Sequence, residues 1–407
     1  MDENIINDFL LKVPGARRSA QGLMIPLGDG GFFHVLGQHS AAEMDGLTDD
    51  ESFYLAFCAK KEIFRLREIR SAHDYLLRLR ANAIVDFPRL VRVMDARRAE
   101  YERTGRPWSL THYYHSKDHY YKSYINLLQK ADAKVVKKTP SGLIFANEVN
   151  AMCIRSLAGD VVVASECLEY FYYFMTIALY GESFDVEIVD RIDALLIAIR
   201  LVSGVEALDF DIDPRGRFDA EVERKVRQLV ANQMKFTFGH EYAHLLCGHL
   251  AGPDVLVKLN GFDGVEDSRH RVRAYSHEIE FQADFFSLKN VSHNSDAFNA
   301  VAHGAFSVLI FLYFIDLVSG FCKLPKFSVS ITHPTPRDRI EALHKIFGRK
   351  SPFTGEMLSD SIDVVERLAK LFEGRVLNSD RKDILTFYGS IYLSGYTDKL
   401  RRDRYDF

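Results

Sequence analysis

The chain has 407 residues, of which 47% are hydrophobic and 27% are charged, ordinary values for a globular protein with one large core or two to three domains. A formal net charge of −4 gives no electrostatic basis for binding nucleic acid. The five cysteines form no C-x-x-C pair, so neither a disulfide framework nor a cysteine zinc site is indicated, and reduced thiols in an apolar core are expected at Cys58, Cys153, Cys167, Cys247 and Cys322.

The first third of the chain is expected to be mostly helical. Apolar residues such as Leu77 and Leu90 recur at helical intervals among many charges over residues 49–103, and the Gly-Arg-Pro segment at residues 105–107 ends this block. We therefore predict a helical N-terminal region over residues 1–140.

Three histidines lie close together at the end of this region. His112, His115 and His119 have partly helical spacing, which raises the question of a metal site. Tyrosines are interleaved with them at positions 113, 114, 120 and 121. Because these rings favour aromatic packing or contact with a partner, we expect that role here rather than metal binding.

A helix carrying the most informative motif is predicted next. Asp219 is a plausible N-cap, apolar residues recur at helical intervals after it, and Gly248 supplies the stop. His240 and His244 are four residues apart and share one helical face, with Glu241 beside them, in a His-Glu-x-x-His arrangement. Burying these groups would be costly without partners, and a metal ion is the simplest compensation. The alternative is a pair of core histidines without metal.

A catalytic zinc ion usually has three protein ligands, so a third is expected downstream. Ser276 can cap a further helix, on which Glu280 is the candidate third ligand. His277 shares the face of Glu280 and is the alternative ligand, whereas Glu278 points away and is expected to be solvated.

Asp284 lies one turn after Glu280 on the same face of this helix. Metal-bound histidines usually donate their second ring N–H to a carboxylate or a carbonyl. We predict that Asp284 accepts such a hydrogen bond; the alternative is an ordinary surface aspartate. His249, directly after Gly248, is expected to cap the helix or lie at the surface, with a hydrogen bond near the site as the alternative.

The longest apolar stretch is predicted to be a core helix. Residues 300–315 fall short of the about 20 apolar residues that span a bilayer, contain His303 and end at Asp316. The chain begins Met-Asp-Glu-Asn and shows no basic-then-apolar signal sequence, so a cytoplasmic protein is expected.

The remaining residues, 348–407, are predicted to form a C-terminal helical extension. Residues 359–396 indicate two or three short helices, and residues 399–404 indicate a charged, solvated tail.

These motifs resemble a known family. The His-Glu-x-x-His motif followed by Glu280 and Asp284 looks like the gluzincin metallopeptidases, most closely the group of the CAAX prenyl proteases and the HtpX heat-shock proteases. Thr332-His333-Pro334, with Arg339 shortly after it, is similar to that family's S/T-H-P motif, and residues 150–168 resemble its edge hairpin and following helix.

The resemblance spans roughly residues 145–345, about half of the chain. It implies an α+β, predominantly helical fold, with a zincin-like metallopeptidase domain at residues 141–347 and a small edge β-sheet. It also implies that Val161, Val162 and Val163 form an edge strand to which a substrate peptide could add. The relatives it points to are typically integral membrane proteins, and this chain departs from them in lacking a clear membrane span.

The implied activity is that of a zinc-dependent endopeptidase acting on a protein or peptide substrate. One Zn²⁺ per chain would be held by His240, His244 and Glu280, with Glu241 as the general base. For the oxyanion donor, His333 is the first candidate, and Arg339 either serves instead or forms a structural ion pair near the zinc helices.

Two alternatives remain open. A helix that ends in Gly-His after this motif also resembles, more loosely, the phage-exclusion peptidase Lit, which implies a selective defence-type protease activated by a partner or a signal. From another class comes a catalytically silent, metal-stabilised regulatory or binding protein. The intact Glu241 argues against it, because a purely structural metal site has no need of a general base.

Overall fold

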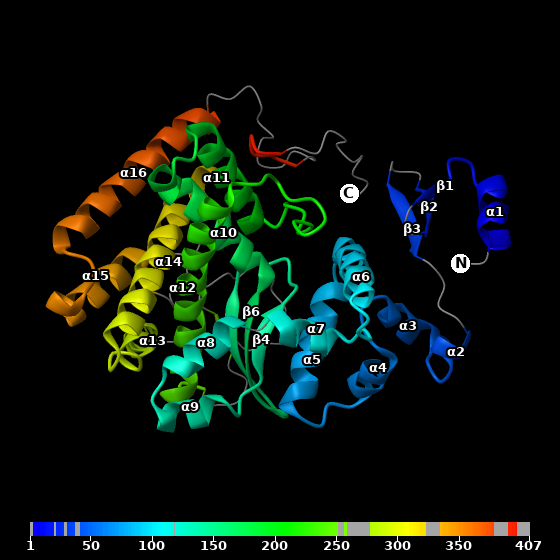
Figure 1. The fold of residues 1–407 in the computed structure, drawn as a ribbon, viewed down its shortest axis with the longest axis horizontal. Helices are drawn as coiled ribbons and strands as arrows, with labels where there is room; N and C mark the ends of the chain where they lie inside the picture. The colour runs from blue at the N-terminus through cyan, green and yellow to red at the C-terminus, as the bar shows by residue number, and fades with distance from the viewer. Residues whose placement is uncertain are drawn as a thin grey trace.

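The computed structural model is predominantly helical and contains two small β-sheets, in agreement with the expected α+β class (Figure 1). It describes most of the chain, and all structural statements below concern these residues: 3–19, 22–27, 31–36, 41–117, 119–250, 256–258, 277–322, 334–377 and 390–396.

The N-terminal region contains a small sheet that the sequence patterns did not predict. After α1 (Glu3–Lys12), strands β1 (Arg17–Ser19), β2 (Gly22–Pro26) and β3 (Phe32–Leu36) pair antiparallel in sequence order. The following helices are α2 (Ala41–Met44), α3 (Asp49–Ser52), a 3₁₀ helix (Phe53–Ala56), α4 (Lys60–Arg67), α5 (Ala72–Val85), α6 (Pro88–Arg103), α7 (Leu110–Lys117), α8 (His119–Leu127) and α9 (Lys130–Val136).

The second sheet has four strands in the order β4-β6-β5-β7, formed by β4 (Ser141–Ile144), β5 (Ala151–Ser156), β6 (Gly159–Ser165) and β7 (Leu256–Lys258). Strands β5 and β6 form the expected antiparallel hairpin. The prediction that Val161, Val162 and Val163 form an edge strand is wrong. They lie in β6, which pairs with β4 on one side and β5 on the other, so substrate cannot add to β6.

Both faces of this sheet are covered, which explains the run of consecutive valines. Val161 and Val163 point to one face and pack with Leu76 of α5. Val162 points to the opposite face and joins the main core, where β5 and β6 contact the central helix.

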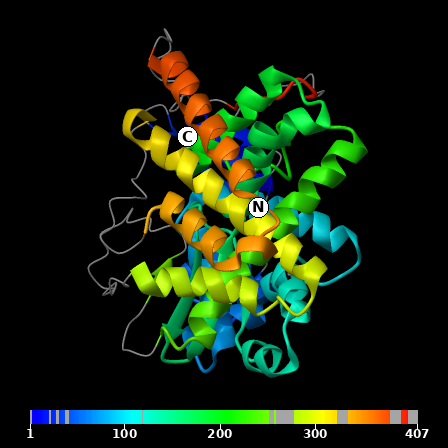
Figure 2. The same ribbon diagram turned by 90° about the vertical axis from the view of Figure 1, so that its left-hand side faces the viewer.

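The second half of the protein is built around the long helix α12, which contacts α8, α10, α13 and α14 (Figure 1). In Figure 2, α15 and α16 lie across α14 on its outer side, and both contact it. The elements are α10 (Glu166–Tyr180), a 3₁₀ helix (Gly181–Phe184), α11 (Ile188–Val202), α12 (Ala220–Leu246), α13 (His277–Lys289), α14 (Ser295–Cys322), α15 (Pro336–Phe347), a 3₁₀ helix (Gly348–Lys350) and α16 (Gly355–Leu377).

Helix α14 contains the long apolar stretch. Its length and composition would allow it to cross a membrane, but 72% of its most apolar window is buried inside the protein. It therefore packs as the core helix that the sequence indicated.

The C-terminal extension differs from its prediction. One 23-residue helix, α16, replaces the first of the two or three short helices expected, and residues 390–396 are not helical. The apolar face of α16 is continuous because it packs along α14, which stabilises one long helix. The predicted charged tail, residues 399–404, lies outside the described residues.

A single large core joins the three predicted regions. It contains Leu77 from the N-terminal region, Val162 from the central one and Phe372 from the C-terminal one. The division at residues 140 and 347 stays a prediction.

Candidate metal centre

Local sequence signals place the His-Glu-x-x-His motif on α12. The Asp219 side chain accepts hydrogen bonds from the backbone N–H groups of Glu221 and Val222, as a helix N-cap does. At the other end Gly248 adopts φ +71°, the left-handed conformation that ends helices. The motif occupies the last two turns between these caps, where it is fully buried.

The two histidines converge with Glu280 of α13. His240 Nε2 and His244 Nε2 lie 3.1 Å apart, and they lie 3.5 and 3.7 Å from the two carboxylate oxygens of Glu280. Ligand atoms about 2.0–2.1 Å from a tetrahedral ion are separated by roughly 3.3 Å. The three side chains are therefore spaced to hold one metal ion, and within the described ranges they form the one such group.

The candidate third ligands at the start of α13 differ in burial. Glu280 is fully buried, whereas His277 and Glu278 are exposed. Glu278 accepts a hydrogen bond from Gln282 on the surface of the helix. Ser276, the expected cap, lies outside the described residues. Glu280 is thus the residue of this segment that the structure brings to the two histidines.

Asp284 and Arg339 form a buried pair behind His240. Asp284 Oδ1 lies 2.9 Å from His240 Nδ1, the arrangement expected for a carboxylate that orients a ligating imidazole. The guanidinium of Arg339, on α15, donates to both Asp284 oxygens at 2.7 and 2.6 Å. Burial acts to raise the pKa of Asp284, but the charge and hydrogen bonds of Arg339 and the hydrogen bond with His240 hold it below its usual value.

His249 lies closer to the centre than its expected capping or surface role implies. Its Nδ1 is 3.0 Å from His244 Nδ1, and its Nε2 is 3.2 Å from Gln282 Oε1. After Gly248 the His249 backbone N–H donates to the His244 carbonyl, the closing bond of a Schellman turn. This turn folds the chain back toward the second ligand. A histidine directly after the terminal glycine was therefore the signal for this contact.

Glu241 is the group that no structural role accounts for. Among the described residues, no donor makes a well-formed hydrogen bond to either of its buried carboxylate oxygens. The charge of His240 and the backbone N–H of Cys153 on β5 both act to lower the pKa of the Glu241 carboxyl. Burial, with the charge of Glu280, outweighs both and raises the pKa of Glu241 to about 8. A buried carboxyl group that has no well-formed hydrogen bond and a raised pKa indicates a further partner, such as a metal ion or a water molecule.

The two histidines differ in their electrostatics. Burial acts to lower the pKa of His240, but Asp284 and Glu280 overcome it and raise the value to about 9. Burial and the neighbouring His240 hold the pKa of His244 well below its usual value. The protein thus supplies a negatively charged environment on one side of the pair, which favours a cation between them.

The remaining sequence candidates lie elsewhere. His333 lies outside the described residues. His112, His115 and His119 are exposed and belong to no metal-holding group among the described residues. The five cysteines are free, and all but the half-buried Cys247 are buried, as expected for reduced core thiols.

A scan against protein-family models found no match, and searches of curated proteins and of solved structures found none either. What the site itself defines is therefore a buried group of two histidines and one glutamate that could hold a metal ion.

Proposed function

We propose that the protein is a zinc-dependent endopeptidase that hydrolyses peptide bonds in a protein substrate. The observation that carries this proposal is the buried Glu241 carboxylate, which lacks a well-formed hydrogen bond from the described residues and adjoins the converging His240, His244 and Glu280. A structural metal site needs no such extra carboxylate, whereas a hydrolase needs a general base beside its metal.

The donor set supports zinc. Two imidazole nitrogens and one carboxylate oxygen leave a fourth tetrahedral position open, which is the usual composition of a catalytic zinc site. The same three donors also suit ferrous iron, and the adjacent base favours hydrolysis over oxidation. We therefore assign one Zn²⁺ per chain.

The residues take the following roles in this proposal. A zinc ion would supply Lewis-acid polarisation of the peptide carbonyl and acidify a water molecule. Glu241 accepts the proton of that water and returns it to the leaving amine. Asp284 orients His240 and is itself held by Arg339, so Arg339 takes the structural alternative and positions the site. His333 stays our candidate for the oxyanion donor.

The architecture supports a zincin-like core. The β5–β6 hairpin lies against α12, the helix that carries the motif, and α13 delivers the glutamate from the other side. We place the enzyme in the cytoplasm, without a membrane span. The defence-type variant, activated by a partner or a signal, remains a special case of the same chemistry.

Metal analysis of purified protein tests the site. Inductively coupled plasma mass spectrometry should find one zinc per chain in the wild type and in Glu241→Gln, and none in folded His244→Ala or Glu280→Ala. Glu278→Gln, on the exposed side of α13, is the matched control and should keep its zinc. Absence of metal in the wild type after zinc addition under reducing conditions would refute the proposal.

Peptidase activity needs a test that does not require the substrate in advance. Protein N-termini in cells expressing the wild type should include cleavage products that are missing in cells expressing Glu241→Gln. If both proteins hold zinc and yield identical N-termini, the metal-stabilised binding protein becomes the better description.

A further inference from the structure

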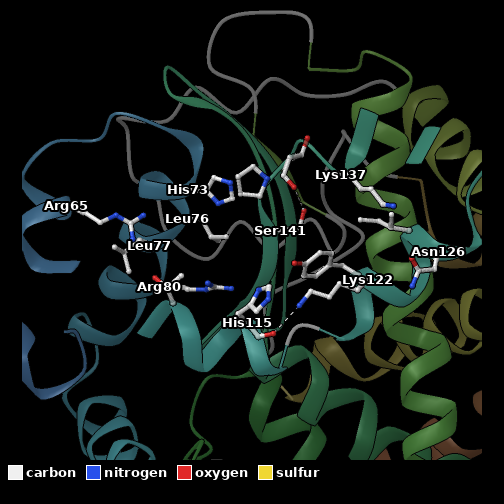
Figure 3. Close-up of a pocket in the computed structure, with 15 residues that line it drawn as sticks. Arg65, His73, Leu76, Leu77, Arg80, His115, Lys122, Asn126, Lys137 and Ser141 are labelled. Atoms are coloured by element: carbon white, nitrogen blue, oxygen red, sulfur yellow. Dashed lines mark hydrogen bonds between the residues drawn. The ribbon is translucent and has the colours of Figure 1, made fainter. Parts of the chain in front are cut away.

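The protein has a cavity that lies away from the metal ligands. It has a volume of about 400 Å³ and opens between α4, α5, α7, α8 and the turn that joins α9 to β4 (Figure 3). That volume is within the range of small-molecule binding sites. None of His240, Glu241, His244 or Glu280 lines it, so it is distinct from the metal centre.

The lining of this cavity is basic, although the chain as a whole carries a net negative charge. Among the described residues that line it are two arginines, two lysines and two histidines but no aspartate or glutamate; the six are Arg65, His73, Arg80, His115, Lys122 and Lys137. Arg65 forms an ion pair with Asp74 at 2.8 Å. Besides Arg65, the lining carries three further permanently charged side chains, those of Arg80, Lys122 and Lys137.

Contacts with the surrounding protein hold one of these basic side chains, Arg80, in a fixed position. Arg80 is only 3% exposed; its Nε donates to the Leu143 carbonyl of β4, and its guanidinium lies 4.5 Å from the ring of Tyr114. In Figure 3, Arg80 and His115 point toward the same part of the cavity from different helices. Because these contacts hold Arg80 in place, little side-chain entropy would be lost when it binds an anion.

Two further lining residues, Thr111 and Lys137, offer hydrogen-bonding or charged groups to a ligand. The hydroxyl of Thr111 is buried and has no hydrogen-bond partner among the described residues. Lys137 is exposed and forms no ion pair within the described part of the chain. An unpaired buried hydroxyl beside a cluster of cations is costly unless a ligand or water satisfies it.

We propose that this cavity binds a small molecule that carries two or more phosphate groups. Three positively charged side chains, with no carboxylate among the described lining residues, match a polyphosphate better than a single carboxylate, and arginine offers the fork of donors that phosphate oxygens accept. Leu76, Ile125 and Pro140 add an apolar wall that suits the remainder of such a molecule.

Helix α8 links this cavity to the metal centre. Its Lys122 and Ile125 line the cavity, while its Tyr124 packs against Gly239 and stacks on Tyr242 of α12. The Tyr124 hydroxyl also donates to the Ser287 carbonyl of α13. Helix α8 therefore lines the cavity on one side and contacts both helices that carry the metal ligands on the other.

Isothermal titration calorimetry of the full chain with sodium pyrophosphate, and separately with ATP, tests this proposal. We expect saturable binding at one site. Lys137→Glu and Lys122→Gln should each weaken it by about tenfold or more, since each loses a charge-assisted contact to phosphate. Lys138→Glu is the matched control, because Lys138 is the exposed neighbour that does not line the cavity, and it should bind as the wild type does.

A further variant separates this site from the metal. Folded Glu280→Ala, which lacks a metal ligand, should bind pyrophosphate with unchanged affinity. Absence of saturable binding in the wild type, equal weakening by Lys138→Glu, or loss of binding in Glu280→Ala would each overturn the proposal. None of these results depends on zinc content or peptidase activity, so the two proposals fail separately.

Discussion

At the scale of single residues, Asp284 connects a metal ligand to the rest of the fold. It is 1% exposed and accepts from both His240 and Arg339, so the imidazole, the carboxylate and the guanidinium form one buried chain of hydrogen bonds. A buried ion pair contributes little net stability, because desolvation offsets the attraction. Its value here is positional: it fixes the tautomer and the direction of the His240 ring.

Asp284→Asn should therefore weaken zinc binding by about 10- to 100-fold, since an amide orients the imidazole less strongly than a carboxylate does. Competition with a chromophoric zinc chelator measures the affinity of the folded variant. Glu278→Gln, on the exposed face of the same helix, should leave the affinity unchanged. Equal affinities for all three proteins would show that Asp284 does not orient a ligand.

Asp74 gives a pH-dependent contribution to stability. Its buried carboxylate accepts from the Ser71 hydroxyl and from Arg65, both at 2.8 Å. Burial acts to raise the pKa of Asp74, but these hydrogen bonds and the charge of Arg65 lower it overall. A lowered pKa in the folded state stabilises the protein above the unfolded value of about 3.9, and this stabilisation is lost as the pH falls through the folded value.

Asp74→Asn should reduce the free energy of unfolding by about 1.5–3 kcal/mol at pH 7, the range for a hydrogen bond to a charged group. The difference from the wild type should shrink as the pH falls below about 4, where the wild-type carboxylate also becomes protonated. Urea unfolding at stepped pH values measures both quantities. A difference that stays constant down to pH 3 would contradict the assigned role of the charge.

At the scale of elements, the close approach of α14 to α12 determines how the metal helix is held. A Cβ atom added at Gly304 would lie 2.1 Å from the Asn232 carbonyl oxygen, so only glycine allows this contact. By contrast, Gly320 on the same helix has no atom of the described residues within 4 Å of such a Cβ position. The two glycines therefore separate packing from helix propensity.

Gly304→Ala should destabilise the protein by about 1–3 kcal/mol or more, because the backbone of one helix must move. Gly320→Ala should be neutral or stabilise by up to about 1 kcal/mol, since alanine favours a helix. Thermal and urea unfolding followed by circular dichroism compare the two. If both variants behave alike, α14 does not pack against α12 at this point.

At the scale of the whole molecule, the C-terminal helix belongs to the common core. Phe372 of α16 packs with its ring centroid 6.4 Å from Phe314 and 6.0 Å from Phe321, both on α14. Leu371, its neighbour in the chain, is 73% exposed. The only tryptophan, Trp108, lies in the N-terminal region and is buried in the same core.

Phe372→Ala should lower the free energy of unfolding by about 3–5 kcal/mol through the cavity it leaves, whereas Leu371→Ala should change it by no more than about 0.5 kcal/mol. Fluorescence of Trp108 during urea unfolding is the measurement. If the protein unfolds as one unit, the transition reported by Trp108 shifts with Phe372→Ala. An unshifted Trp108 transition would show that the C-terminal extension unfolds separately.

Whatever depends on a few neighbouring residues could be predicted from the sequence. The Asp219 cap and the left-handed Gly248 bound the motif helix, and the spacing of four residues places His240 and His244 on one face, because helical periodicity acts within single turns. Glu280 was predicted as a ligand from its position on a second predicted helix, together with the resemblance to the gluzincin motifs. The contact of His249 near the site, predicted as the alternative to a capping or surface role, also follows from a short turn.

Relations between distant segments were decided by the tertiary structure. The three valines of β6 are typical of edge and interior strands alike. The pairing of β6 with β4 on one side and β5 on the other makes it an interior strand. Arg339 meets Asp284 across 55 residues, and five segments of the chain assemble the basic cavity. Such contacts depend on which apolar faces pack together, and no local periodicity specifies that choice.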